Sequence, residues 1–462
     1  MFIEVLAILI SLGLLMFLAY RGFPVIVIAP LVTLLAVALS GAALLPSYTE
    51  VYMPNLSNYI KTWFPIFILG AVFGKLMELN GATTAIAKQI MNIFGIKRAL
   101  LATILACSIL TYGGVSLFVV VFAVYPFAAA VFREAGIPKR FIPAVIVLGG
   151  CTYTMDAFPG TPQIQNIIPT NYFGTDAYAA PITGLVAGSV IFLLGYLWLS
   201  RRVNKANLAG EGYGEGHTNE PVINPDEKVI NFWLAIIPLA VVVILNFVFT
   251  KTSLAVSHWY APELLQETFN IQNLSSLSST WALIVALVVG IIAALLINIK
   301  SFTASKLSSG LTIAASGSLL AVFNVASEVG FGNVVKTLPG FEVVRNAITG
   351  VSSHPLISES IAVNVLAGVV GSSSGGMSIA LEVMGQHYLD LANSMGIDPE
   401  YLHRIASMSA GGLDSLPHSG ATITILVICG LTHRQAYGDI FAITIMKALV
   451  AFSTAVILSL FV

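Results

Sequence analysis

The chain has 462 residues, of which 57% are hydrophobic and only 9% are charged, and its formal net charge at pH 7 is −1. Soluble domains carry about 25% charged residues, so this composition excludes an ordinary soluble protein, and the near-neutral charge gives no basic surface for nucleic acid. Apolar runs about 20 residues long recur along the whole chain, which predicts an all-α polytopic membrane protein embedded in the lipid bilayer.

Apolar runs open and close the first half of the chain, residues 1–200. These candidate spans lie at residues 2–20, 23–45, 62–80 and 181–200, with an amphipathic segment at 82–90. Between them, residues 99–132 contain no Asp, Glu, Lys or Arg and carry Gly113-Gly114 near their middle. This stretch is too long for one crossing and short for two, so we predict a re-entrant hairpin with its tip at the glycines. A single long span kinked at glycine is the alternative.

An interrupted helix follows this hairpin at residues 141–174. The apolar run is broken by Asp156 and then by Pro159-Gly-Thr-Pro162. Proline and glycine end or kink helices, and a carboxylate inside a membrane segment is usually functional. We therefore predict a broken helix here. The polar residues 201–228 form the predicted cytoplasmic linker between the two halves.

The second half, residues 229–462, repeats this order. Its candidate spans lie at residues 229–250, 278–298, 308–328 and 440–462, with an amphipathic segment ending near Gly350. Its hairpin is predicted at residues 355–393 with the tip at Gly371–Gly376, and its broken helix at residues 403–430 around Asp414. Gly113-Gly114 precedes Gly149-Gly150 by the same number of residues as Gly375-Gly376 precedes Gly411-Gly412, which indicates an internal repeat.

Counting crossings gives the orientation of the two halves. Three spans, a hairpin that returns to its own side, a broken helix and a final span make five crossings per half, so the halves form an inverted-topology repeat. Most Lys and Arg residues then fall on one side, which should be cytoplasmic, and both termini lie outside the cell's inner (plasma) membrane. The side with fewer Lys and Arg residues carries Lys61, Lys251, Lys336, Arg345 and Arg404, while Lys75 and Lys447 fall within spans.

Substrate is expected where the hairpin tips meet the broken helices, because exposed N–H groups, glycines and hydroxyls there can hold an organic anion. The candidate substrate-binding residues are Gly113, Gly114 and Ser116 at the first tip, Thr154, Gly160 and Thr161 at the first break, Ser372, Ser373, Ser374 and Gly375 at the second tip, and His418, Ser419 and Thr422 at the second break. The competing interpretation is that these small residues only permit close helix packing.

Asp156 and Asp414 are the candidate ion-coupling residues, since each is an intramembrane carboxylate at a break. Their alternative role is to cap the helix that restarts after the break. A proton is the expected coupling ion, with sodium as the alternative, because unwound loops also offer carbonyls and hydroxyls to Na⁺. Glu78 and Glu328 end the third spans and are expected near the interface, with Lys75 as a partner for Glu78.

An enzymatic function is not expected. Gly371-Ser-Ser-Ser-Gly375 matches the G-x-S-x-G nucleophile motif, but that motif works on a strand-to-helix turn with a positioned His and acid. The scattered cysteines and the lack of metal or nucleotide motifs predict no metal site and no cofactor. A passive anion channel and a membrane enzyme remain as alternatives to a transporter.

The sequence resembles the gluconate:proton symporter (GntP) family. The resemblance rests on residues 70–82, which look like that family's third span, and on residues 152–162 and 410–420, which look like its two unwound loops. It implies proton-coupled uptake of small hydroxy-monocarboxylates and a homodimer whose transport domains move as elevators. The first break departs from the family's His- and Pro-rich pattern, so 3-hydroxybutyrate and glycerate stand beside gluconate as candidate substrates.

Overall fold

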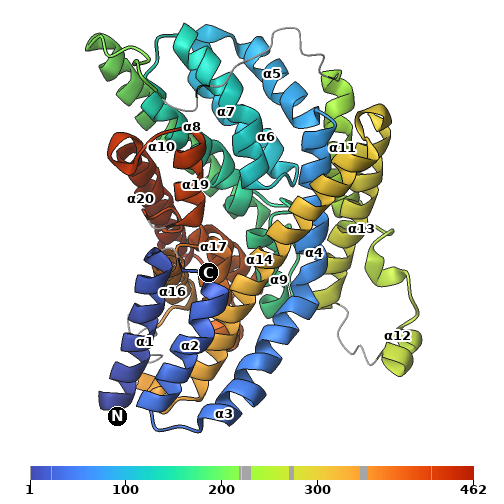
Figure 1. The fold of residues 1–462 in the computed structure, drawn as a ribbon. Helices are drawn as coiled ribbons and strands as arrows, with labels where there is room; N and C mark the ends of the chain where they lie inside the picture. Colours follow the sequence, from blue (N-terminus) through green and yellow to red (C-terminus); the bar gives the residue numbers. More distant parts are fainter. Residues whose placement is uncertain are drawn as a thin grey trace.

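The computed structural model describes residues 2–21, 23–217, 220, 230–269, 275–343, 352–417 and 419–462. All regular elements in these residues are helices (Figure 1). The first half contains α1 (Phe2–Tyr20), α2 (Val25–Leu39), α3 (Leu44–Pro46), α4 (Met53–Leu79), α5 (Ala82–Phe94), α6 (Ala99–Tyr112), α7 (Leu117–Glu134), α8 (Ile142–Gly150), α9 (Ile164–Phe173) and α10 (Pro181–Leu208). The second contains α11 (Phe232–Lys251), α12 (Pro262–Phe269), α13 (Ser275–Leu296), α14 (Ala304–Thr337), α16 (Pro355–Val370), α17 (Ser373–Met395), α18 (Pro399–Ala410), α19 (Gly420–Ile428) and α20 (His433–Leu458).

The prediction of an all-α polytopic membrane protein is confirmed. Within the described residues, six helices are long and apolar enough to cross a bilayer, or seven if α5 and the segment Ile96–Tyr112, bent by 102°, form one span. The six are Leu44–Leu79, Pro181–Leu208, Phe232–Lys251, Leu277–Leu296, Ala304–Thr337 and His433–Leu458. The predicted spans at residues 2–20 and 23–45 form shorter apolar helices, and ten crossings stay a prediction.

The two longest helical segments lie side by side and antiparallel. One runs from α3 through a π-helical turn at Ser47–Tyr52 into α4, and the other is α14 (Figure 1). Gly310 near the start of α14 packs against Leu79 at the end of α4, and Gly330 further along packs against the Tyr52 ring. Because α4 and α14 occupy the same place in the two halves, their antiparallel packing is the arrangement that an inverted repeat requires of them.

Both predicted hairpins form as helix pairs. Hairpin 1 is α6 and α7 joined at Gly113–Ser116, and hairpin 2 is α16 and α17 joined at Gly371-Ser372. Gly114 and Gly371 have φ angles of +93° and +71°, which only glycine adopts without strain. The tip of hairpin 2 is shorter than expected, because Ser373–Gly376 already form the first turn of α17. Re-entry of either hairpin into the membrane stays a prediction.

Both predicted broken helices are also interrupted. Break 1 (residues 151–163) separates α8 from α9 and contains a π-helical turn at Tyr153–Ala157, and break 2 (residues 411–419) separates α18 from α19. Helix α10 continues to Leu208, so residues 201–208 of the predicted linker are helical. The second amphipathic segment falls partly on residues 344–351, which lie outside the described residues.

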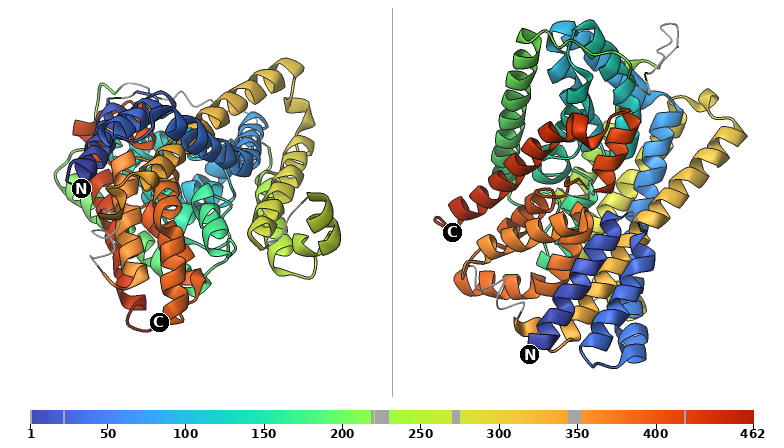
Figure 2. Two further views of the ribbon diagram at one scale, coloured as in Figure 1. Left: turned by 90° about the horizontal axis from the view of Figure 1, so that it is seen from below. Right: turned by 60° about the vertical axis from the view of Figure 1, so that its left-hand side comes forward.

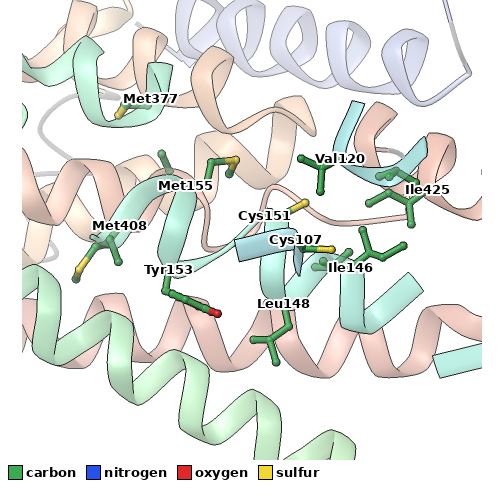
Figure 3. Close-up of a cluster of buried hydrophobic side chains, with 14 of the residues drawn as sticks. Cys107, Val120, Ile146, Leu148, Cys151, Tyr153, Met155, Met377, Met408 and Ile425 are labelled. Carbon is green, nitrogen blue, oxygen red and sulfur yellow. The ribbon is translucent and has the colours of Figure 1, made fainter. Parts of the chain in front are cut away.

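A buried apolar cluster joins the two halves around the breaks (Figure 3). It brings Cys107 of α6 and Cys151 of break 1 together with Met408 of α18 and Ile425 of α19. Helix α12 lies away from this core, on an arm at the edge of the molecule (Figure 2). The breaks are therefore packed inside protein, which is the only place where irregular backbone is tolerated at membrane depth.

Close backbone contact within hairpin 2 gives a test of this packing. A Cβ atom at Gly376 would overlap the backbone of Ala367 on α16, whereas a Cβ at Gly317 of α14 would meet open space. We expect Gly376→Ala to destabilise the purified protein by about 1–3 kcal/mol, because overpacking against backbone cannot be relieved by a side-chain movement. Gly317→Ala, the control, should leave the melting temperature in detergent unchanged or slightly higher. Equal melting temperatures for the two variants would contradict the hairpin geometry.

Candidate functional site

A buried ion pair lies at the centre of the two breaks. The Lys447 ammonium, on α20, lies 2.6 Å from Asp156 Oδ2 of break 1 and donates to the Cys151 carbonyl at 2.5 Å. Both side chains are buried. The Asp414 carboxyl of break 2 lies close enough to act electrostatically on the same ammonium. One cation thus serves the predicted coupling acids of both halves.

Glycines let break 2 approach these charges closely. A Cβ atom at Gly411 would overlap both the Lys447 ammonium and the Asp156 carboxylate, and one at Gly412 would overlap Asn364 Oδ1 of hairpin 2. Any side chain at Gly411 would separate the second break from the first. The two breaks therefore touch through backbone rather than through side chains alone.

Arg404 of α18 binds the irregular backbone that follows Asp156. Its guanidinium donates to the Ala157 carbonyl at 3.1 Å, to the Ala179 carbonyl at 2.7 and 3.0 Å, and to Asn166 Oδ1 at 2.8 Å. The neighbouring Ser407 hydroxyl donates to the Asp156 carbonyl at 2.6 Å. Charge counting assigns Arg404 to the membrane face with the poorer set of cations, which stays a prediction, and its side chain is fully buried in the protein. Free carbonyls at the break explain why a buried cation is tolerated there.

Two glutamines at the start of α9 connect both hairpin tips to break 1. The Gln163 amide donates to the Thr111 carbonyl at 2.7 Å and to the Val115 carbonyl at 3.2 Å, both in hairpin 1. The Gln165 amide donates to the Ser373 hydroxyl of hairpin 2 at 2.8 Å. In addition, the Ser373 hydroxyl lies beside Asp414. The two tips and the two breaks are thus brought together, as the sequence predicted.

The hydroxyls of several predicted substrate residues form hydrogen bonds with the backbone. The Thr154 hydroxyl donates to the Gly149 carbonyl at 2.8 Å and the Thr422 hydroxyl to the Ser415 carbonyl at 3.2 Å. Ser372 caps α17 by accepting from the Gly375 N–H at 3.2 Å. These hydrogen bonds hold the three hydroxyls in fixed orientations, and their role in binding a substrate stays a prediction.

The glycines and the remaining serines of the predicted set lie at closely packed positions. Gly113 packs against Leu239 of α11, and Ser116 lies against Gly74 of α4. Gly160, with φ of +79°, packs against the Tyr178 ring. The other members are Gly114, which packs against Pro162, Ser374 in the first turn of α17, and Ser419, the buried residue that precedes α19. His418 lies outside the described residues.

Buried polar atoms near the tips lack partners within the described residues. They are the hydroxyls of Thr111 and Thr161 and the Oε1 atom of Gln165. Buried polar groups are nearly always hydrogen-bonded, so unpaired ones at the junction of tips and breaks are candidates to meet a ligand. Asp414 accepts a 2.7 Å hydrogen bond from the adjacent Ser415 hydroxyl and lies beside the Ser373 hydroxyl, whereas Asp156 pairs with a cation.

Sequence reasoning missed Lys447, Arg404, Gln163 and Gln165. Lys447 offered a usable signal, because a lone cation within an apolar run needs a buried partner. The sequence offered no such signal for Gln163 and Gln165, because their partners are backbone carbonyls and a serine that is distant in the chain. The expected pair of Lys75 with Glu78 is present at 2.6 Å. A cavity of about 360 Å³ lies away from the tips, lined by Thr175, Asp176, Thr250, Asp398 and Glu400 among others.

Residues 3–406 match the family described as GntP family permease. The chain is 45% identical over 471 residues to a Bacillus subtilis protein described as uncharacterized transporter YxjC, and this match covers 99% of both proteins. It is 31% identical over 147 residues to an uncharacterized transporter of Haemophilus influenzae, covering 31% of this chain and 33% of that protein.

Two solved transporters share the fold at low sequence identity. The Neisseria gonorrhoeae MtrF structure, described with a class of antimetabolite efflux pumps, matches with a TM-score of 0.56 and 13% identity over 94% of each chain. The Alcanivorax borkumensis YdaH transporter matches with a TM-score of 0.53 and 16% identity over 87% of this chain and 86% of that one. These likenesses concern the architecture alone.

The Asp156–Lys447 pair predicts non-additive mutants. Lys447→Met leaves a buried carboxylate without its cation, so we expect it to destabilise the protein by about 3–5 kcal/mol, measured by thermal unfolding in detergent. Adding Asp156→Asn should recover a large part of this loss, because the double variant buries no unpaired charge. The control is Lys75→Met, which removes a partly exposed partner and should cost about 1 kcal/mol or less. Additive effects of Lys447→Met and Asp156→Asn would show that the pair is not formed.

Proposed function

Since this chain belongs to the GntP family of permeases and is a multi-pass membrane transporter, we propose that it is a proton-coupled symporter of a small hydroxy-monocarboxylate such as gluconate, 3-hydroxybutyrate or glycerate. The observation that carries this proposal is that the tip of hairpin 2 and both breaks meet around Asp156, Lys447 and Asp414, while Gln163 joins the tip of hairpin 1 to break 1. Secondary transporters with internal repeats bind substrate and coupling ion at such discontinuous helices.

Helix N-termini at this junction favour an anionic substrate. Helices α7, α9, α17 and α19 each begin at a tip or directly after a break. The first N–H groups of a helix have no partner within it and carry partial positive charge, so they hold carboxylates without a full cation. The unpaired hydroxyls of Thr111 and Thr161 can bind the substrate's own hydroxyl groups. A small hydroxy acid offers both kinds of group.

Asp414 is the better candidate for the proton carrier of the two acids. Protonation of Asp156 would leave the Lys447 ammonium without its partner at 2.6 Å, which is costly for a buried cation. Asp414 accepts from a neighbouring hydroxyl and has no cation in direct contact among the described residues. It can therefore bind and release a proton without breaking an ion pair.

The wider transport cycle follows the same proposal. The tips and breaks pack on α4 and α14, for example where Ser116 meets Gly74, so they can move along these helices as one unit in an elevator cycle. We place the protein in the inner (plasma) membrane as a homodimer with both termini outside. Exposed apolar side chains on α1 and α2, such as Leu9 and Leu31, face lipid or the second subunit in this arrangement.

Transport assays in proteoliposomes test the proposal. We expect an inwardly directed proton gradient to drive uphill accumulation of one member of a panel of labelled three- to six-carbon hydroxy acids. Equal uptake in sodium and choline buffers separates proton from sodium coupling. Downhill flux without accumulation would indicate a passive channel, and a chemically altered product would indicate an enzyme. Either outcome would reject the symport proposal.

Asp414→Asn separates coupling from substrate binding. Because the amide cannot carry a proton, we expect this variant to lose accumulation driven by a pH gradient while substrate exchange across the membrane continues. The matched control is Asp398→Asn, an exposed acid that caps α18, and it should behave as wild type. Uphill uptake that survives in Asp414→Asn would exclude Asp414 as the proton carrier.

A further inference from the structure

A further buried carboxylate, Glu328, lies outside the cluster of Asp156 and Asp414. It was expected near the membrane interface at the end of a span, and this was wrong, because α14 continues to Thr337 and leaves Glu328 inside the helix with 3% of its surface exposed. Its carboxylate lies against the tip of hairpin 2, where a Cβ atom at Gly375 would overlap Glu328 Oε2. Gly375 therefore allows the acid to touch the first turn of α17.

The surroundings of Glu328 contain hydroxyls and no cation among the described residues. Tyr52 and Tyr59, from the long segment that includes α4, lie close enough to act on it electrostatically, and the Tyr59 hydroxyl faces Ser378 of α17. Glu328 Oε2 has no hydrogen-bond partner among the described residues, and the Tyr52 hydroxyl lies beside Ser327. Helix α2, which also packs on α14, carries no titratable side chain, and Glu382 further along α17 is engaged by Tyr172 and Lys336.

The equivalent acid of the first half is neutralised instead. Glu78 occupies the matching position near the end of α4, but it is 35% exposed and pairs with Lys75 at 2.6 Å. Glu328 has no such cation, and an isolated charge in a low-dielectric interior costs several kcal/mol. The positive end of α17, which Gly375 brings into contact, offsets a negative charge there.

We propose that Glu328 is a second proton-binding site, whose carboxylate holds the tip of hairpin 2 on α14 and whose protonation releases it. This inference rests on the proposed proton-coupled transport. When Glu328 is charged, moving the tip away would remove the compensation that the start of α17 gives to this charge, so the hairpin stays. When the acid is neutral, the attraction to the start of α17 disappears and the hairpin is free to move.

A proton fits this site better than a metal cation. Sodium sites in transporters draw on unwound backbone carbonyls as well as side chains. Around Glu328 the backbone of α4, α14 and α17 is helical, so its carbonyls are occupied by helix hydrogen bonds. The site offers a carboxylate and a few hydroxyls, which can donate to the charged acid or accept from the neutral one.

Glu328→Gln in the full-length protein tests the proposal in proteoliposomes. The amide mimics the protonated acid, so we expect substrate exchange to continue and to lose its dependence on pH. Accumulation driven by a pH gradient should fall about tenfold or more. Glu78→Gln is the matched control and should couple as wild type. Glu328→Asp retains a carboxyl and should keep gradient-driven accumulation, which distinguishes lost proton binding from a misfolded protein.

The outcomes separate this proposal from the function on which it rests. Wild-type protein that ignores the pH gradient would overturn the proposed symport itself. Wild type that couples, together with Glu328→Gln that couples equally well, would overturn the role of Glu328 alone. If Glu328→Gln does not fold, infrared difference spectra of the wild type at high and low pH decide the matter by comparison with Glu328→Asp. A protonated-carboxyl band that shifts in Glu328→Asp supports the proposal, and an unchanged band rejects it.

Discussion

An interrupted helix at membrane depth leaves backbone N–H and C=O groups that lipid cannot satisfy, and this constraint governs the architecture of the site. In break 1, two buried cations from the other half of the chain bind the exposed carbonyls. Arg404 binds the carbonyls of Ala157 and Ala179, and Lys447 binds the Cys151 carbonyl together with the Asp156 carboxylate. The carbonyls of the irregular backbone thus stabilise the two buried cations, and the cations in turn satisfy carbonyls that have no partner within a helix.

The two halves meet this constraint differently. Break 1 is longer and is held by Arg404 and Lys447, whereas Gly411 and Gly412 of break 2 press directly against Lys447 and Asn364. The third spans differ as well, since Glu78 pairs with Lys75 whereas Glu328 has no lysine partner in the part of the chain that the structure describes. A repeat that keeps the same order of helices has therefore distributed its charges asymmetrically, which gives the two hairpins different electrostatic roles.

Much of the helical order could be predicted from the sequence, because apolar length and Gly/Pro interruptions act locally. The glycines at 113–114 and 371 do end helices, and the breaks around Asp156 and Asp414 lie where expected. What could not be predicted depends on pairs distant in sequence. Gln165 and Ser373 are far apart in the chain, as are Lys447 and Asp156, and nothing in the pattern at either position specifies its partner. The position of Glu328 could not be predicted, because the apolar run ends near this residue whereas helix α14 continues to Thr337.

The contacts of Arg404 and Lys447 with break 1 also bear on how the two halves depend on each other. Both cations belong to the second half and the backbone they bind belongs to the first, while Gln165 of the first half serves Ser373 of the second. Break 1 therefore depends on the second half for its cations, whereas break 2 is served by its own half, because the Ser415 carbonyl accepts from Thr422 and Tyr437 and the Pro417 carbonyl lies 2.8 Å from His433 Nε2. A chain cut within the linker would still require both halves to be synthesised in the same membrane.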